Sequence, residues 1–175
     1  MALCGNFSGT TNVAIGHQTM ELNNSGSRNM AVGELALRSN ASGNDNVAIG
    51  NYTAFNNQTG YSNVAIGTYA LYYSTDRNNL VAIGDSALHN NGTGAVQSYD
   101  GVGNTAIGSK SLYSNTIGYN NTASGGNALY ANTSGYNNAA YGLQALQTNF
   151  NGIGNTAVGV GADVNSGSLQ NATAI

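Results

Sequence analysis

The chain has 175 residues, of which 25 are glycine and 29 are asparagine, while proline and tryptophan are absent. Only 6% of the residues are charged and the formal net charge is -3, so no basic cluster is available to neutralise nucleic-acid phosphates. No apolar run is long enough to span a bilayer, so we expect no membrane insertion. Gly/Asn-rich composition can indicate low complexity, but apolar residues make up 41% and recur in fixed columns, which favours a folded repeat.

A five-residue phrase, Asn-Val-Ala-Ile-Gly, recurs along the whole chain. Its alanine returns every 17 residues, apart from one step of 24 residues. A fixed period of this size is typical of a solenoid, in which each repeat is one turn stacked on the last. We expect a single solenoid domain over residues 1–175, with a seven-residue insertion near 95–101. The ten alanines are Ala14, Ala31, Ala48, Ala65, Ala82, Ala106, Ala123, Ala140, Ala157 and Ala174.

In each repeat, the first expected element is a short strand around this alanine. β-Branched residues flank it in most copies, as Val64 and Ile66 flank Ala65. Because neighbours along a strand point to opposite faces, the alanine faces one side and the branched residues face the other. Both faces are apolar, as in strands that are buried on two sides. The pattern leaves open which face points into the coil.

A glycine ends the phrase in nine copies, from Gly16 to Gly159. We expect a tight corner there, with a positive φ or a close backbone approach. Four residues later comes a second apolar column, leucine in most copies and usually preceded by alanine, as in Ala36 and Leu37. This column predicts a second short strand. The repeat closes on an Asn-x-x-Gly turn, and its stacked asparagines predict amide ladders from coil to coil.

Such a thin coil has room for only a narrow internal seam. The second apolar face of the first strand therefore needs cover from outside the coil. Three copies around an axis would bury that face, and cyclic homo-oligomers are the usual solution to such a patch. The sequence therefore predicts an all-β, parallel β-solenoid of about ten 17-residue coils that forms a homotrimer. A dimer packed sheet on sheet is the alternative.

The phrase Asn-x-Ala-Ile-Gly, followed by x-x-Ala-Leu, resembles the YadA-like head repeats of trimeric autotransporter adhesins and the repeats of phage and viral tail fibres. The likeness extends from about Asn12 to Ile175. It implies a left-handed parallel β-roll that is trimeric and attaches to a host-cell surface. The period of 17 exceeds that of the shorter adhesin repeat, and no heptad run indicates a stalk.

We also see no secretory signal at the start of the chain. These departures favour a phage or viral fibre, assembled in the host cytoplasm and displayed on the virion surface. The alternatives are a purely structural shaft or spacer and the head of a bacterial trimeric adhesin.

Two features are candidates for contact with a host-surface glycan or protein. The first is the insertion, with Gln97, Tyr99 and Asp100, because loops on rigid scaffolds often carry function. An exposed turn also tolerates an insertion that has no function. The second is a tyrosine column eleven residues after the glycine, formed by Tyr61, Tyr119 and Tyr136. Another aromatic column, five residues after the glycine, contains Phe55, Tyr72, Tyr113 and Tyr130. Both columns are also compatible with a trimer seam.

No group of residues indicates catalysis or metal binding. His17 and His89 lie in different coils, with no second histidine or cysteine nearby, so neither a zinc site nor a catalytic triad is expected. The seven carboxylates do not recur in a column, which excludes the calcium-binding nonapeptide solenoid. Cys4 is alone, so no disulfide is expected within the chain. We therefore expect a non-enzymatic protein without cofactor or metal.

Overall fold

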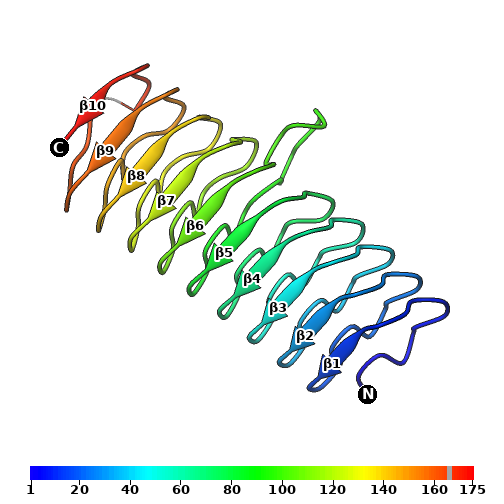
Figure 1. Ribbon diagram of the computed structural model, residues 1–175. Coiled ribbons are helices and arrows are strands. Elements are labelled where there is room, and N and C mark those ends of the chain that lie inside the picture. Colours follow the sequence, from blue (N-terminus) through cyan, green and yellow to red (C-terminus); the bar gives the residue numbers. More distant parts are fainter. Residues whose placement is uncertain (165–166) are drawn as a thin grey trace.

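The computed structural model describes residues 1–164 and 167–175 and shows a rod of stacked coils (Figure 1). Ten short strands pair in chain order to form one parallel sheet, and the described part of the chain contains no helix. The all-β, parallel β-solenoid prediction is therefore confirmed, with ten strands and the turns between them. The strands are β1 (Val13–Ile15), β2 (Met30–Val32), β3 (Val47–Ile49), β4 (Val64–Ile66), β5 (Val81–Ile83), β6 (Thr105–Ile107), β7 (Thr122–Ser124), β8 (Ala139–Tyr141), β9 (Thr156–Val158) and β10 (Thr173–Ala174).

All strand pairs share one register, in which the marker alanine of each coil lies opposite that of the next. Ala65 pairs with Ala82, and Ala82 pairs with Ala106 across the longer 24-residue step. The extra residues between β5 and β6 therefore leave the sheet undisturbed. In a parallel sheet a slip of one residue would exchange the two faces, so the repeated alternation fixes this register.

The alanine face of the sheet points into the coil. Ala65 and Ala106 have no exposed surface, whereas Ile15 is 59% exposed and Ile107 is 42% exposed on the opposite face. The flanking residues are therefore the outer surface of the sheet, which settles the choice that the sequence left open. The interior accepts only a methyl group because the opposing wall of the coil, with its leucine column, lies close by.

Replacement of Ala65 by leucine is expected to overpack this interior. The added methylenes have no free volume in a close-packed seam, and the expected loss in free energy of unfolding is about 1–3 kcal/mol. Thermal unfolding followed by circular dichroism measures the loss. Gln58→Leu, at an exposed turn, is the control and should leave the melting temperature nearly unchanged. An unchanged melting temperature for Ala65→Leu would contradict the assignment of the alanine face.

The glycines that end the strands form the expected corners. Their φ angles lie between 126° and 143°, a range that residues with a side chain rarely adopt. The backbone of the next coil also lies very close, since a Cβ built on Gly84 would be 2.6 Å from the carbonyl carbon of Gly108. Glycine is therefore required at a corner such as Gly84 for two reasons, the positive φ and the close approach of the next coil.

The segment after each corner is a pair of tight turns, so the prediction of a second strand there is wrong. Leu35 and Leu37 both have left-handed backbone angles, with φ of 58° and 49°. The same two offsets are left-handed in the other coils from Gln18 to Leu146. A strand needs extended backbone at successive residues. The alternating left-handed residues instead curl the chain around the leucine, which stays buried.

Two columns of buried asparagine link the coils. In the first, here called the turn ladder, Asn132 Nδ2 donates to Asn115 Oδ1 of the previous coil at 2.7 Å. In the second, the entry ladder just before each strand, Asn138 Nδ2 donates to Asn121 Oδ1 at 3.1 Å and to the carbonyl of Gly152 at 2.7 Å. These contacts confirm the predicted amide ladders. The turn ladder contains Asn6, Asn23, Asn40, Asn57, Asn91, Asn115, Asn132 and Asn149, and the entry ladder contains Asn12, Asn29, Asn46, Asn63, Asn104, Asn121, Asn138 and Asn155.

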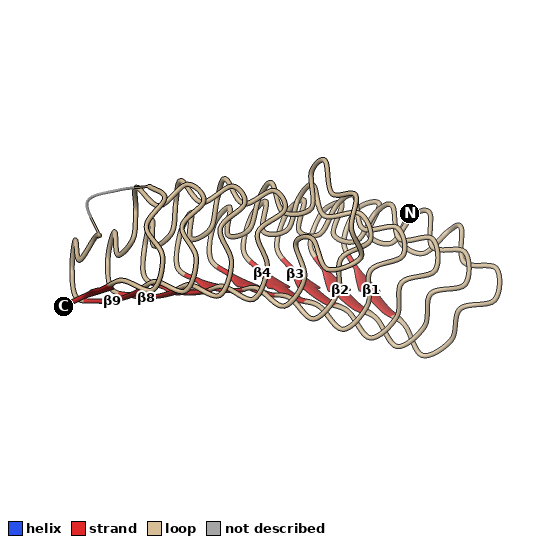
Figure 2. Cartoon of the chain, turned by 90° about the horizontal axis from the view of Figure 1, so that it is seen from above, coloured by secondary structure: helices blue, strands red, loops and turns tan. Residues whose placement is uncertain are grey.

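The rod has two different sides. The sheet forms one side along its whole length (Figure 2), and the insertion between β5 and β6 projects from an edge of the rod (Figure 1). None of the described segments forms a helix that is long and apolar enough to cross a membrane. The molecule therefore presents an apolar sheet surface on one side and carries the insertion at an edge.

Candidate contact surface

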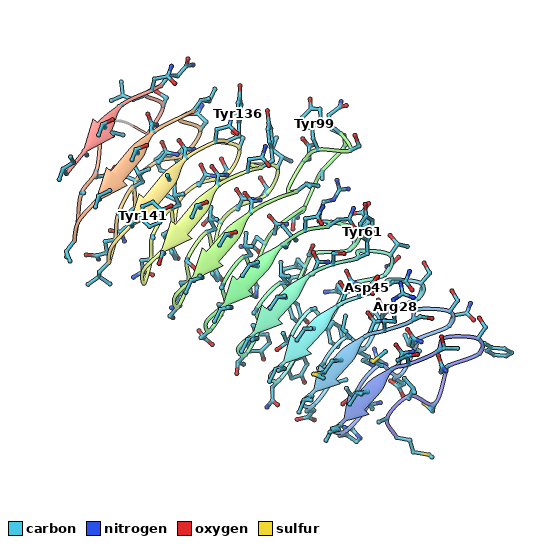
Figure 3. All side chains as sticks on the ribbon, in the orientation of Figure 1. Arg28, Asp45, Tyr61, Tyr99, Tyr136 and Tyr141 are labelled. Atoms are coloured by element: carbon cyan, nitrogen blue, oxygen red, sulfur yellow. The ribbon has the colours of Figure 1, made fainter. Side chains whose placement is uncertain are left out.

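The insertion between β5 and β6 leaves the rod as a distinct loop, with Tyr99 near its tip (Figure 3). The chain follows the regular path as far as Gly92, whose N–H donates to the carbonyl of Thr116 at 2.7 Å. It is back against the next coil at Gly101, whose N–H donates to the carbonyl of Ile117 at 3.1 Å. The residues between these two anchors form the part of the chain that departs from the repeat.

Arg77, one coil before the loop, holds the loop in place. Its Nη1 donates to two loop carbonyls, those of Gln97 at 3.1 Å and of Asp100 at 3.0 Å. Its Nε and Nη2 donate to the two carboxylate oxygens of Asp76, each at 2.8 Å. The arginine is only 8% exposed, and its stem crosses Gly92, where a Cβ would be 2.8 Å from Arg77 Cγ. One guanidinium nitrogen of Arg77 therefore holds the loop, while the other two pair with Asp76.

The Asp100 side chain is turned into the loop and binds the loop's own backbone. One carboxylate oxygen accepts hydrogen bonds from the N–H of Val96 at 3.0 Å and from that of Gln97 at 2.8 Å. The residue is 4% exposed. This carboxylate therefore satisfies backbone donors of the loop and does not extend to the surface.

In the coil that contains Arg77, the asparagine of the turn ladder is also replaced, by Ser74, and the reason is steric. In a regular coil the turn glycine lies three residues after the asparagine of the turn ladder. A Cβ on Gly60 would be only 2.3 Å from Asn57 Oδ1. Arg77 occupies this glycine position and has a Cβ, and the asparagine position before it holds the shorter Ser74. Ser74 Oγ is the one buried side-chain polar atom in the described residues that lacks a hydrogen-bond partner.

A third departure in the same coil is Leu80. In the entry ladder an asparagine donates to a carbonyl 14 residues later, as Asn63 Nδ2 does to Arg77 at 2.9 Å. Position 80 instead holds a fully buried leucine, which makes no such hydrogen bond. Three columns thus change together in the coil that precedes the loop. Arg77 is not among the residues predicted from the sequence, although the simultaneous loss of Asn, Gly and Asn at positions 74, 77 and 80 is a visible signal.

The structure brings most of the candidate residues together. Tyr99 from the loop packs edge to face on Tyr119, with ring centroids 5.2 Å apart, and Tyr119 stacks on Tyr136 at 4.6 Å with parallel rings. Gln97 lies in the same loop as Tyr99. Tyr61 lies on the same edge of the rod but further toward the N-terminus, and no described aromatic ring stacks on it (Figure 3). The loop and two tyrosines therefore form one surface, from which Tyr61 is separate.

This surface carries little free charge. Desolvation, followed by the influence of Tyr136 and Tyr99, raises the pKa of Tyr119, so its phenol stays neutral at physiological pH. Further along the same edge, Arg28 Nε lies 2.6 Å from Asp45 Oδ1, and this hydrogen bond lowers the pKa of the Asp45 carboxyl (Figure 3). The ionised side chains of this edge are thus paired with each other.

The other aromatic column forms a continuous stack, and one of its members, His89, is not among the residues predicted for this column from the sequence. His89 lies between Tyr72 and Tyr113, with ring centroids 5.4 Å and 5.1 Å away and nearly parallel planes. The stack continues to Phe55 on one side and Tyr130 on the other. His89 stands five residues after Gly84, so its offset was the signal. The rings cover one another, which indicates a role in holding the coils together.

The described residues contain no cluster of histidine, cysteine, aspartate and glutamate side chains that is able to hold a metal ion. No cavity or cleft opens among them either. What the geometry offers is a convex surface of aromatic, amide and hydroxyl groups. Such a surface is suited to contact with another molecule.

No protein-family model, curated protein sequence or solved structure matches this chain.

Proposed function

We propose that this chain is a segment of a trimeric fibre that attaches a phage or virus to the surface of its host cell. In this proposal each chain is a left-handed β-roll, three chains assemble around an axis, and the fibre stands on the virion surface. The observation that carries the proposal is the apolar outer face of the sheet, which runs along the whole rod.

The outer face of the sheet is unusually apolar for an exposed surface. Ile15, Ile49 and Ile107 are 59%, 37% and 42% exposed, and they occupy equivalent positions in β1, β3 and β6. Contiguous apolar patches of this kind are rare on monomers and mark interaction sites. A closed homo-oligomer hides the patch of every copy at once, whereas an unpaired patch promotes aggregation.

The position of the sheet supports three-fold assembly through its outer face. The insertion projects from the edge of the rod that also carries Tyr61 and Tyr136, so it leaves the outer face of the sheet uncovered (Figure 3). Three chains that pack through their sheets would therefore carry three copies of the loop. Three equivalent contact surfaces on one rigid body provide avidity, so each one needs only modest affinity.

The proposal predicts the mass of the protein in solution. Multi-angle light scattering should give three times the chain mass of 17.8 kDa. A double variant, Ile49→Lys with Ile66→Lys, should shift the mass to one chain, because it places like charges at the centre of a desolvated interface. Gln58→Lys, at an exposed turn, is the control and should remain trimeric. A monomeric unaltered chain, or a double variant that stays trimeric, would contradict the assembly.

A purely structural spacer is the second candidate, and the uniform register of the coils favours it. Repeats that contact only their neighbours build length without needing a binding surface. A trimer that attaches to no cell would support this candidate. The fluorescence of cells incubated with the labelled chain distinguishes the two functions.

A further inference from the structure

We propose that the loop segment Val96–Tyr99, here called the finger, is a preformed contact element that enters an uncharged, partly apolar cleft of a protein on the host surface. This inference rests on the attachment function proposed above and specifies the class of partner.

The finger is held rigid from below. Arg77 Nη1 bonds the carbonyls at residues 97 and 100, and the Asp100 carboxylate bonds the N–H groups at residues 96 and 97. Asn91 Nδ2, a member of the turn ladder, donates to the carbonyl of Gly101 at 2.8 Å. Both ends of the finger are thus tied to buried polar groups. A loop fixed in this way loses little conformational freedom when it binds, which favours affinity.

The rod itself is altered to accommodate the finger. An insertion that is merely tolerated at an exposed turn requires no change in the coil before it. Here that coil lacks an asparagine of each ladder, at Ser74 and Leu80, and buries an arginine in place of a glycine. The buried Ser74 hydroxyl without a partner is a local loss of stability. The coil thus loses stability at Ser74 and gains in Arg77 a side chain that fixes the loop. This combination indicates that the position of the finger matters for function.

The shape of the finger favours a protein partner over a saccharide. Val96 is 85% exposed and Tyr99 is 54% exposed, so the tip is convex and partly apolar. Small ligands, including sugars, are bound in concave sites, and no hollow opens anywhere in the described residues. A projecting loop instead complements a concave surface of a folded protein, as long antibody loops do. Tyr99, supported by Tyr119 behind it, is suited to be the central anchor.

The charges of the finger define the partner further. The Asp100 carboxylate is turned into the loop, so we assign this residue a positioning role there and no direct contact. Arg77 is buried and paired with Asp76. The tip residues Val96, Gln97, Ser98 and Tyr99 carry no formal charge at neutral pH. Because an unpaired charge is costly to desolvate, the complementary cleft should be uncharged where the finger enters.

The test uses the labelled trimer and a panel of bacterial and eukaryotic cells, with binding curves recorded by flow cytometry. Three changes are compared: Tyr99→Ala, Tyr61→Ala, and a fingerless chain. The fingerless chain lacks residues 95–101 and carries Ser74→Asn, Arg77→Gly and Leu80→Asn. These substitutions restore the regular repeat, so this chain should fold at least as well as the original one. Circular dichroism and light scattering check this before binding is measured.

We expect Tyr99→Ala to weaken binding about tenfold or more, because it removes the anchor of the contact. The fingerless chain should lose specific binding, while Tyr61→Ala should bind like the original chain. Pretreatment of the cells with a protease should abolish binding, and periodate oxidation of surface glycans should leave it intact. If the fingerless chain does not fold, the comparison between Tyr99→Ala and Tyr61→Ala carries the test.

Two results would overturn the inference and leave the attachment function standing. In the first, the fingerless chain or Tyr99→Ala binds cells as well as the original chain, so that another surface makes the contact. In the second, binding survives the protease and is lost after periodate, so that the partner is a glycan. Absence of binding to every cell type of the panel would overturn the attachment function and the inference with it.

Discussion

Gly108→Ala is expected to lower the free energy of unfolding by about 2–6 kcal/mol, enough to unfold a marginally stable chain. Two effects combine at this corner. The φ of Gly108 is 126°, where a residue with a side chain is strained. The new Cβ would also lie 2.6 Å from the carbonyl carbon and 2.7 Å from the carbonyl oxygen of Gly125. These atoms belong to the backbone of the next coil, so they cannot move aside without disturbing the sheet.

The chain contains a matched control for this prediction. Gly159 has nearly the same backbone angle, with φ of 131°, but the nearest atom to its Cβ position is Ala162 Cβ at 3.8 Å. Gly159→Ala therefore retains the backbone strain without the close approach and should cost about 1–3 kcal/mol. Chemical denaturation of both variants measures the difference. Equal losses at the two corners would mean that coil-to-coil approach contributes nothing to the requirement for glycine.

Asn132→Leu is the second substitution with a large expected effect, a loss of about 2–6 kcal/mol in the free energy of unfolding. The side chain is fully buried, and leucine has similar size but no polar atoms. The change leaves two buried groups without partners: Asn115 Oδ1, which accepts from Asn132 at 2.7 Å, and Asn149 Nδ2, which donates to it at 3.0 Å. Each unsatisfied buried group costs about 1–3 kcal/mol.

The control for this ladder is an asparagine outside it. Asn151 is exposed, so Asn151→Ala should change the free energy of unfolding by no more than about 0.5 kcal/mol. Denaturant titration followed by circular dichroism compares the two variants. If Asn132→Leu proved as mild as Asn151→Ala, the buried amide ladder would not be a determinant of stability. The natural interruption at Ser74 would then also need a different explanation.

Much of the fold follows from the periodic pattern of the sequence. The alternation around Ala65 predicts a strand with one methyl-only face, and the structure has that face in the interior. The glycine column predicts corners with positive φ, which Gly108 and its equivalents have. The asparagine columns predict ladders, which Asn115 and Asn132 form. These features depend on residues that occupy the same place in successive coils, so a fixed period is sufficient to place them.

The prediction of a second strand is wrong because the residue types do not reveal that the backbone is left-handed there. Leucine is rarely left-handed, yet Leu37 has a φ of 49°, because the short coil has to curl around it. The hydrophobic pattern gives the burial of Leu37 correctly, but it carries no information about the sign of φ. A strand and a pair of tight turns can both place one buried residue beside an exposed one.

The sequence by itself determined that this chain is a rod of in-register coils, because a 17-residue period with conserved columns has few other solutions within one chain. Only the tertiary structure decided which face of the sheet is outside, that Arg77 holds the insertion, and that Tyr99 packs on Tyr119 while Tyr61 is separate. The physical reason is that a repeat specifies contacts between equivalent positions. A contact between a unique loop and its neighbours depends on the path of the chain in space, which no repeated column records.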